Sequence, residues 1–197
     1  PRHFVGSGGG WYFNDWHATR ANTNGLLLQK ASHDIDVMHW ICGSHTVRTH
    51  AFGALTHFGG DEPDDLRCPD CDRQETCVEV SPATPEGVSM RDRCVFRREV
   101  DVEDVSMINM QFANGVLASY AQCHFAPDYE RNYTFIGTEG RIESDEPNEK
   151  IRFWRRDPKR IHSKPDEIFD CAAPEGSHGG ADPQIVQDFT AMVLDDT

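Results

Sequence analysis

The histidine at position 33 is the side chain in this sequence best suited to acid–base chemistry. It lies in the segment 25–41, one helical turn after Gln29, and Asp36 and Trp40 continue the same line. An imidazole titrates near neutral pH, so it can accept or donate a proton under physiological conditions. Its place beside an amide and a carboxylate indicates the wall of a site. The alternative is a structural histidine held by hydrogen bonds.

The same segment is predicted to be one helix, residues 26–42. Its apolar residues recur at steps of three and four, which is the period of a helix with one buried face. They are Leu28, Ala31, Ile35, Met38 and Cys42. Three candidate N-caps precede the helix at positions 22–24, with Gly25 at its entry. Lys30 and Asp34 are one turn apart and are expected to form an ion pair on the surface.

Aromatic rings and polar side chains are interspersed just before this helix. They are Trp11, Tyr12, Trp16, His17 and Arg20. Rings of this kind stack on the C–H face of a sugar-like molecule while polar groups bind its hydroxyls. We therefore predict that Trp16, His17 and Arg20, together with Asp36, bind a polar, ring-shaped substrate. The alternatives are that two or three of the rings belong to the core and that Asp36 orients the helix.

Four of the seven cysteines lie in or beside a polar insertion at residues 59–92. Cys68 and Cys71 are separated by two residues, Cys77 follows after five, and Cys94 after sixteen. A pair of cysteines two residues apart is typical of a zinc knuckle. A zinc ion would tie down an insertion that is too polar to bury itself. Zinc, free thiols and a disulfide remain as three alternatives for these residues.

The rest of the chain is dominated by short strands. Alternating apolar residues predict them at 47–52, 94–100, 105–112, 116–124, 133–136, 141–143 and 151–154. Tight turns at Asn114-Gly115, where both residues tolerate a positive φ, and at 138–140 imply antiparallel hairpins. The predicted fold class is α+β, an open, mostly antiparallel sheet with helices on one face.

The C-terminal part is predicted to be a loop over residues 157–180 followed by a helix. Asp182 and Pro183 have the residue types of an N-cap and a first helical position. The apolar face of this helix is formed by Ile185, Phe189, Met192 and Val193. Near the other end of the chain, the glycine-rich run 6–10 is predicted to be a loop. No apolar strand precedes it and no helical pattern follows it, so it does not match a dinucleotide-binding fingerprint.

Composition limits the classes of partner. The chain has 197 residues, 38% of them hydrophobic and 26% charged, which is typical of a globular domain. Its net charge of −14 argues against a nucleic acid or an anionic membrane, because both bind clustered lysine and arginine. No run of about 18 apolar residues predicts a membrane-spanning helix, and no signal peptide is recognisable. An odd number of cysteines without a secretory signal indicates the reducing cytoplasm.

Three motifs resemble the C-terminal domain of the glucose–fructose oxidoreductase / inositol dehydrogenase / MocA (Gfo/Idh/MocA) family. The first is the helix pattern Gly-x-Leu-Leu-(Asp/Glu)-Lys-x-x-His-Asp-x-Asp, which residues 25–36 match with Gln29 in place of the acid. The other two are residues 114–120 and 133–143, and all three follow the order of the family. The resemblance implies that residues 1–197 are a single C-terminal domain truncated from a longer chain, which would begin with a Rossmann domain.

The resemblance also implies roles for particular residues. His33 would face the substrate and the nicotinamide ring and move the hydroxyl proton as hydride leaves the same carbon. Gln29 stands where many members have an acid, and an amide cannot act as a base. His178 begins a His-Gly-Gly-x-Asp stretch similar to one in some members, where it could reach the substrate; the alternative is an unengaged loop histidine. The catalytic lysine of the family lies in a Glu-Lys-Pro motif that this sequence lacks.

The expected function is therefore that of a substrate-binding and oligomerisation domain in an NAD(P)-dependent oxidoreductase acting on a sugar, cyclitol or related polyol. NAD or NADP would be bound mainly by the absent N-terminal domain, and the fragment alone is expected to be inactive. Its sheet would form a homodimer or tetramer. Two alternatives remain: a non-catalytic sugar-binding or assembly module, and a relative that cleaves glycosides with bound NAD.

Overall fold

A computed structural model of the chain describes residues 1–6, 9–81, 91–161, 164–172 and 176–194. The chain divides into two compact units, Pro1–Asn132 and Tyr133–Thr197, which are described separately. Among the described residues, no helix is both long and apolar enough to cross a membrane. The single-domain organisation expected from the sequence, with its insertion at 59–92, remains a prediction.

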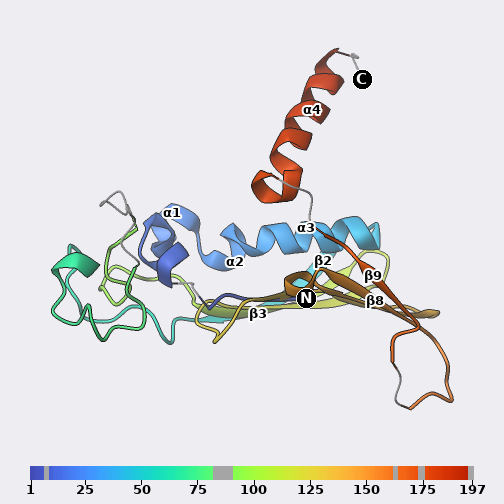
Figure 1. Cartoon of the computed structure of the whole chain (residues 1–197), viewed down its shortest axis with the longest axis horizontal. Helices are drawn as coiled ribbons and strands as arrows, with labels where there is room; N and C mark the ends of the chain where they lie inside the picture. The colour runs from blue at the N-terminus through green and yellow to red at the C-terminus, as the bar shows by residue number, and fades with distance from the viewer. Residues whose placement is uncertain (7–8, 82–90, 162–163, 173–175, 195–197) are drawn as a thin grey trace. The chain divides into compact units, whose positions relative to one another are not determined.

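The first unit is a five-stranded sheet with helices along one face (Figure 1). The strand order is β2-β3-β4-β1-β5, and every neighbouring pair is antiparallel except β1 with β4. The strands are β1 Arg2–Phe4, β2 Thr46–Ala54, β3 Val105–Phe112, β4 Leu117–Cys123 and β5 Glu130–Asn132. The helices are α1 Arg20–Thr23, α2 Leu26–Gln29 and α3 Ala31–Cys42, with shorter turns at η1 Gly9–Phe13, η2 Trp16–Ala18 and η3 Cys68–Asp70. This confirms the predicted α+β class.

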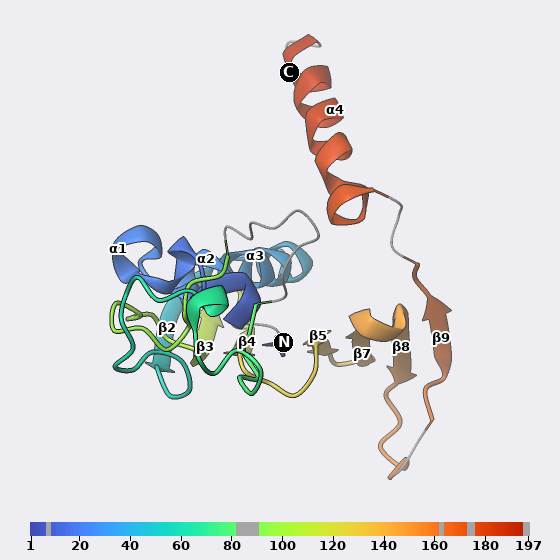
Figure 2. The same ribbon diagram turned by 60° about the vertical axis from the view of Figure 1, so that its left-hand side comes forward.

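The second unit contains a four-stranded antiparallel sheet and the last helix (Figure 2). Its elements are β6 Thr134–Ile136, β7 Gly140–Asp145, η4 Glu146–Asn148, β8 Lys150–Arg155, β9 Glu167–Asp170, η5 Ser177–Gly180 and α4 Ala181–Leu194. Strand β9 lies where the sequence predicted only loop, so that prediction was wrong over four residues. The predicted apolar face of α4 is not buried, because Ile185 and Phe189 are 66% and 63% exposed.

The predicted strand at 94–100 does not form. The chain makes turns there, with isolated bridges between Glu62 and Arg97 and between Arg67 and Arg93. The reason is Arg97, which is fully buried and donates hydrogen bonds to the carbonyl oxygens of Phe13, Cys94 and Asp15. A cation satisfied by carbonyls can be buried, and here it draws the backbone into turns instead of a ladder.

The predicted helix 26–42 forms as two consecutive pieces that meet at Lys30. Gly25, with a φ of 114°, is the N-cap, and Glu103 reaches in from a distant segment to accept a hydrogen bond from Leu27 N at 2.6 Å. A carboxylate at a helix N-terminus stabilises the unpaired N–H groups and the helix dipole. A Cβ on Gly25 would come within 2.8 Å of a Glu103 oxygen, so this entry requires glycine.

The buried stripe of this helix also differs from the prediction. Leu28 is 62% exposed, whereas Asp34 is 1% exposed and lies between the buried residues Ala31 and Met38. The steps 31, 34 and 38 follow the same three-and-four period that the apolar residues were expected to follow. The predicted surface ion pair between Lys30 and Asp34 is therefore wrong, because the carboxylate faces inward.

The turn between β3 and β4 ties the sheet to the end of α3. Only Gly115 has a positive φ, of 89°, and its N–H donates to Phe112 O at 2.9 Å, so Asn114 does not use the conformation predicted for it. The Asn114 side chain instead donates to Cys42 O, the last carbonyl of α3, at 3.0 Å. The turn residue thus caps the helix.

The loop after β2 is organised by one buried carboxylate. Asp104 is fully buried, and its oxygens accept hydrogen bonds from the backbone N–H groups of Thr56, His57 and Phe58 and from the Thr56 hydroxyl, at 2.6–3.1 Å. This turn places Phe58 in the core, where it stacks on Phe13 with ring centroids 4.1 Å apart.

We predict that Asp104→Asn lowers the free energy of unfolding by at least about 2 kcal/mol, because the new amide would face three N–H donors that it cannot satisfy. Urea denaturation followed by circular dichroism measures this change. The matched variant Asp61→Asn, at an exposed position, should stay within about 0.5 kcal/mol of the original protein. An equal effect of both variants would contradict the structural role of Asp104.

Candidate functional site

The predicted catalytic line lies on the outward side of α2 and α3. His33 and Asp36 are exposed, and within the described chain neither makes a side-chain hydrogen bond. Gln29 is half-buried one turn earlier, and its Oε1 is enclosed with no hydrogen-bond partner among the described residues. Trp40 ends the line at 81% exposed. The helix thus presents an imidazole, an amide and a carboxylate away from the sheet.

Asp34 explains why this line points outward. Its carboxylate accepts a hydrogen bond from the Tyr120 hydroxyl at 3.1 Å and one from Arg131 Nε at 2.9 Å. His3 Nδ1 lies 3.5 Å from the same carboxylate, so β1, β4 and β5 all contribute to its surroundings. A buried carboxylate needs such partners. Because Asp34 must face the sheet, the adjacent His33 is turned away from it.

The predicted substrate-binding rings are divided between core and surface. Trp16 is about half exposed and stacks on His17, with ring centroids 3.9 Å apart. His17 is nearly buried, and its other ring contact is an edge of Tyr12 at 5.5 Å. Phe13, which was not among the predicted binding residues, belongs to the core. Of the predicted rings, Tyr12 packs against that core, and substrate binding by the others remains a prediction.

Lys30 connects this aromatic segment to the helix. Its ammonium group lies 5.7 Å from the centre of the Tyr12 ring, which is within the range of a cation–π contact. Burial lowers the pKa of His17; Asp15 acts against this, while Arg91 and Lys30 add to it. Residues 12–17 and the helix positions around 29–33 are therefore parts of one surface that carries titratable groups.

Two predicted substrate-binding residues are engaged in other contacts. The guanidinium of Arg20 pairs with Glu103 at 3.0 Å and donates to Asn24 O, so it supports the entry to α2. His178 is exposed in the second unit, where its Nδ1 lies 2.9 Å from Asp182 Oδ1. The structure places His178 in a different unit from the α2–α3 line, and its predicted role at the substrate remains a prediction.

His124 is a residue that the sequence reasoning missed. It is fully buried beside Tyr12, with ring centroids 5.0 Å apart, and neither ring nitrogen has a hydrogen-bond partner in the described chain. Burial is the main cause that lowers the pKa of His124 to about 3; His3 and Lys30 act in the same direction, and Asp104 opposes them. The sequence held one signal, since His124 continues the inward alternation of Tyr120 and Gln122.

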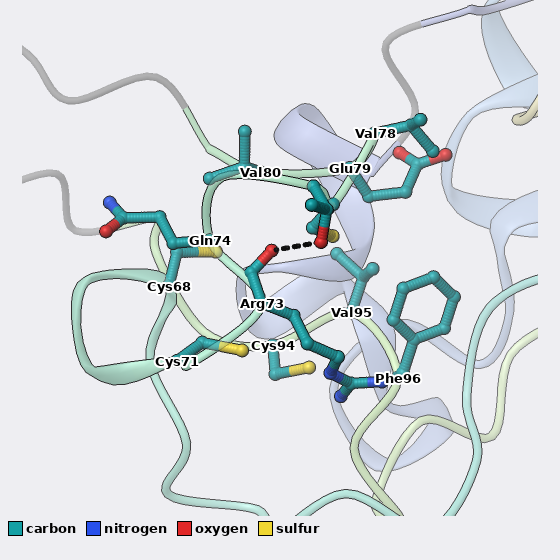
Figure 3. Close-up of a pocket in the computed structure, with 12 residues that line it drawn as sticks. Cys68, Cys71, Arg73, Gln74, Val78, Glu79, Val80, Cys94, Val95 and Phe96 are labelled. Carbon is teal, nitrogen blue, oxygen red and sulfur yellow. Dashed lines mark hydrogen bonds between the residues drawn. The ribbon is translucent and has the colours of Figure 1, made fainter.

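The four insertion cysteines line one cavity of about 290 Å³ in the first unit (Figure 3). All seven cysteines are free, which argues against the disulfide alternative. Burial raises the pKa of the Cys68 and Cys94 thiols. Within the described ranges, no three histidine, cysteine or acidic side chains already stand in the geometry of a metal site.

Comparison with known proteins agrees with this fold. Residues 1–143 match the family model of the GFO/IDH/MocA C-terminal domain. The chain belongs to the GFO/IDH/MocA family. It is 29% identical over 215 aligned positions to a protein of Bacillus subtilis (strain 168) named "Putative oxidoreductase YteT", with 92% of this chain and 50% of that protein covered. The chain thus spans about half the length of this curated relative.

Solved structures share the fold of this family at low identity. UDP-N-acetylglucosamine 3-dehydrogenase GnnA from Acidithiobacillus ferrooxidans aligns with a TM-score of 0.56 at 14% identity, over 100% of this chain and 44% of that one. Levoglucosan dehydrogenase, in complex with NADH and levoglucosan, gives 0.60 at 14%, over 98% and 48%. A super-repressor mutant of Gal80p from Saccharomyces cerevisiae gives 0.63 at 14%, over 99% and 44%.

The pKa of His124 makes a prediction about stability. Because the pKa of about 3 in the folded protein lies below the ordinary histidine value of 6.5, the unfolded chain binds one more proton between these two pH values. Stability should therefore fall as the pH drops from 6.5 towards 3, by up to about 1.4 kcal/mol per pH unit from this group. His124→Leu should reduce that slope. Urea unfolding at several pH values measures it, with Met38→Leu as a buried control that cannot titrate; equal slopes in both variants would contradict the prediction.

Proposed function

We propose that this chain is the substrate-binding half of an NAD(P)-dependent oxidoreductase that acts on a sugar, cyclitol or related polyol. The observation that carries the proposal is the outward position of His33. Within the described chain the His33 ring is exposed and makes no hydrogen bond, and it stands on α3 one turn after Gln29, whose Oε1 is enclosed. Catalytic groups are held in this way by rigid elements that bury their neighbours.

In this proposal His33 accepts the hydroxyl proton of the substrate as the alcohol is oxidised, and returns it in the reverse direction. The bound nicotinamide would supply the other half of the chemistry by accepting or donating hydride. Gln29 cannot take a proton, but its amide can hold a substrate hydroxyl in place. Trp16, stacked on His17 at the surface, offers a ring face to the C–H side of a sugar-like substrate.

The residues of this chain are better suited to lining one side of a nicotinamide site than to binding the whole dinucleotide. The glycine-rich run follows the three-residue strand β1, which the sequence reasoning did not expect, but it leads into a five-residue π-helical turn. A dinucleotide fingerprint needs a longer helix whose N-terminus faces the pyrophosphate. We infer that a separate cofactor domain covers the α2–α3 line. Its apolar edges, Leu28 and Trp40, are 62% and 81% exposed.

The open face of the first sheet supports the proposal of a homodimer or tetramer. The residues on the side opposite the helices include Phe52, Met107 and Leu117, which are 63%, 51% and 77% exposed. Phe52 and Met107 are directly paired across β2 and β3, so the apolar surface is continuous there. A second copy of this face would bury these side chains.

A non-catalytic sugar-binding or assembly module is the competing proposal. It draws support from Gln29, which replaces an acid, and from the fold shared with a super-repressor mutant of Gal80p. A fold shared by dehydrogenases and a repressor does not decide between catalysis and binding. A glycoside-cleaving relative would use the same His33 surface, so the experiments below distinguish the proposals by activity.

We predict that, in the complete protein, His33→Ala lowers kcat/KM for polyol oxidation by at least about 100-fold, as expected for a general acid–base group. The loss should be accompanied by the disappearance of one ionisation from the pH–rate profile. Because His33 is exposed, thermal unfolding should be unchanged. Ser32→Ala, at the exposed neighbouring position, is the matched control and should keep full activity. Normal turnover in His33→Ala would remove the residue from catalysis.

We also predict that Gln29→Asp retains or raises activity, because it restores a side chain that can orient the imidazole of His33. Steady-state kinetics with the same polyols measures this. A strong loss of activity would show that the amide itself is required.

The 197-residue chain alone is expected neither to bind NAD or NADP tightly nor to oxidise polyols, because the residues that the structure describes include no phosphate-binding helix N-terminus after a glycine loop. Isothermal titration calorimetry with each dinucleotide should give no heat of binding. Micromolar affinity would instead place the cofactor site within this chain.

A further inference from the structure

Cys68 and Cys71 at the two ends of η3, together with Cys77 and Cys94, border the same cavity of the first unit (Figure 3). The remaining three cysteines, Cys42, Cys123 and Cys171, are not among the residues that line it. The other walls are mostly apolar, with Val78, Val80, Val95 and Phe96 among them. Thiols gathered within an apolar shell are the environment of a structural metal site.

The backbone brings the two ends of this cluster together. Leu66–Cys68 runs antiparallel to Asp92–Cys94: Cys68 N donates to Asp92 O at 2.6 Å, and Cys94 N donates to Leu66 O at 2.8 Å. An isolated bridge between Arg67 and Arg93 lies between these bonds. In this register Cys68 lies opposite Asp92 and Cys94 lies opposite Leu66, so the two cysteines are diagonal neighbours on the same side of the bridge although 26 positions separate them in the sequence.

The middle of the cluster is a series of tight turns. Cys71 N donates to Cys68 O at 3.3 Å across η3, Gln74 N donates to Cys71 O at 3.2 Å, and Cys77 N donates to Arg73 O at 2.9 Å. Each turn reverses the chain so that the next cysteine returns to the cavity.

We propose that these four cysteines bind one zinc ion as a structural, four-thiolate site. Zinc in structural sites is tetrahedral, and Cys₄ is one of its common ligand sets. Four thiols lose their protons to solvent as the ion binds, so the centre carries two negative charges. The guanidinium of Arg73, whose pKa is held above its usual value by Glu62 and Cys71, lies where it can offset this charge.

Among the described residues the four sulfur atoms do not converge on one point, so zinc binding at the proposed site requires the cysteine side chains to turn towards the cavity. Ligands about 2.3 Å from zinc in a tetrahedron are about 3.8 Å from each other. The sulfur atoms border a cavity instead of touching one another. Rotation about χ1 of a cysteine moves its sulfur atom and leaves the backbone hydrogen bonds of the cysteine cluster in place. The ion would fill space that the protein alone leaves open.

The zinc ion would hold more than the insertion. Arg91 lies 5.2 Å from the centre of the Trp11 ring and pairs with Asp15 at 3.2 Å. Arg97 donates hydrogen bonds to both Cys94 O and Phe13 O. The segment that contains Cys94 is therefore attached to the residues just before Trp16 and His17. Fixing this segment would fix the rings of the proposed substrate surface. The zinc proposal itself does not depend on any activity.

The test begins with the unmodified protein, purified without chelators and exchanged into metal-free buffer. Elemental analysis should find about one zinc per chain, and X-ray absorption at the zinc edge should show four sulfur neighbours at about 2.3 Å. This measurement needs no variant, so a misfolded mutant cannot affect it. Zinc with mainly nitrogen or oxygen neighbours, or no zinc even after zinc is added back, would overturn the proposal.

Variants then assign the ligands. Cys71→Ser and Cys77→Ser should each lose at least about tenfold in zinc affinity, as measured by competition with a chromogenic chelator. They should also become sensitive to proteases between residues 60 and 81. The matched controls Cys42→Ser, Cys123→Ser and Cys171→Ser should keep one zinc per chain. Iron with acid-labile sulfide would overturn zinc in favour of an iron–sulfur cluster, and a mass lower by two hydrogens would overturn it in favour of a disulfide.

Discussion

The buried carboxylate of Asp34 is the interaction on which the arrangement of the first unit depends. A charge with 1% of its surface exposed is stable only when donors surround it, and here the Tyr120 hydroxyl and the Arg131 guanidinium do so. These donors lie on two different strands, so the carboxylate fixes both the rotation of α3 and its position along the sheet. Hydrogen bonds also hold the two ends of the segment formed by α2 and α3. Glu103 accepts one from Leu27 N at the start of α2, and Asn114 donates one to Cys42 O at the end of α3. Polar contacts at these three places therefore fix the position of α2 and α3, and the apolar residues of the two helices contribute only modestly to their attachment.

The sheet face below this helix is unusually polar. His3, Gln122 and His124 are all at most 3% exposed, and each has at least one nitrogen without a hydrogen-bond partner in the described chain. Unsatisfied buried polar groups reduce stability, and natural proteins retain them mainly near functional sites. The separate apolar core around Phe13, Phe58 and Val102 offsets this cost at one end of the unit. Stability and polarity are thus concentrated in different places, with the polar part beneath His33.

The sequence predicted the regular elements better than the contacts between them. The strands β2, β3 and β4 are seven to nine residues long, so their alternation was visible. Strands β1, β5 and β9 have three or four residues, too few to show a period. The wrong strand at 94–100 and the wrong ion pair of Asp34 have a common cause. In both cases a charged side chain, Arg97 or Asp34, is buried through partners more than 80 positions away in the sequence, which no local pattern reveals.

In this fold the residue proposed for proton transfer, His33, and a residue that stabilises the fold, Asp34, are neighbours in the sequence with different roles. Successive positions on a helix differ by about 100°, so one carboxylate fixed against the sheet is enough to direct the preceding imidazole towards solvent. Within the described residues His33 makes no side-chain hydrogen bond, and its side chain can therefore change without loosening the helix. Asp34 cannot change in the same way, because its removal would leave Arg131 and Tyr120 without their shared acceptor. Variation in substrate chemistry within such a domain is consequently expected on the line of Gln29, His33 and Asp36, while the buried network that aims this line is constrained by folding.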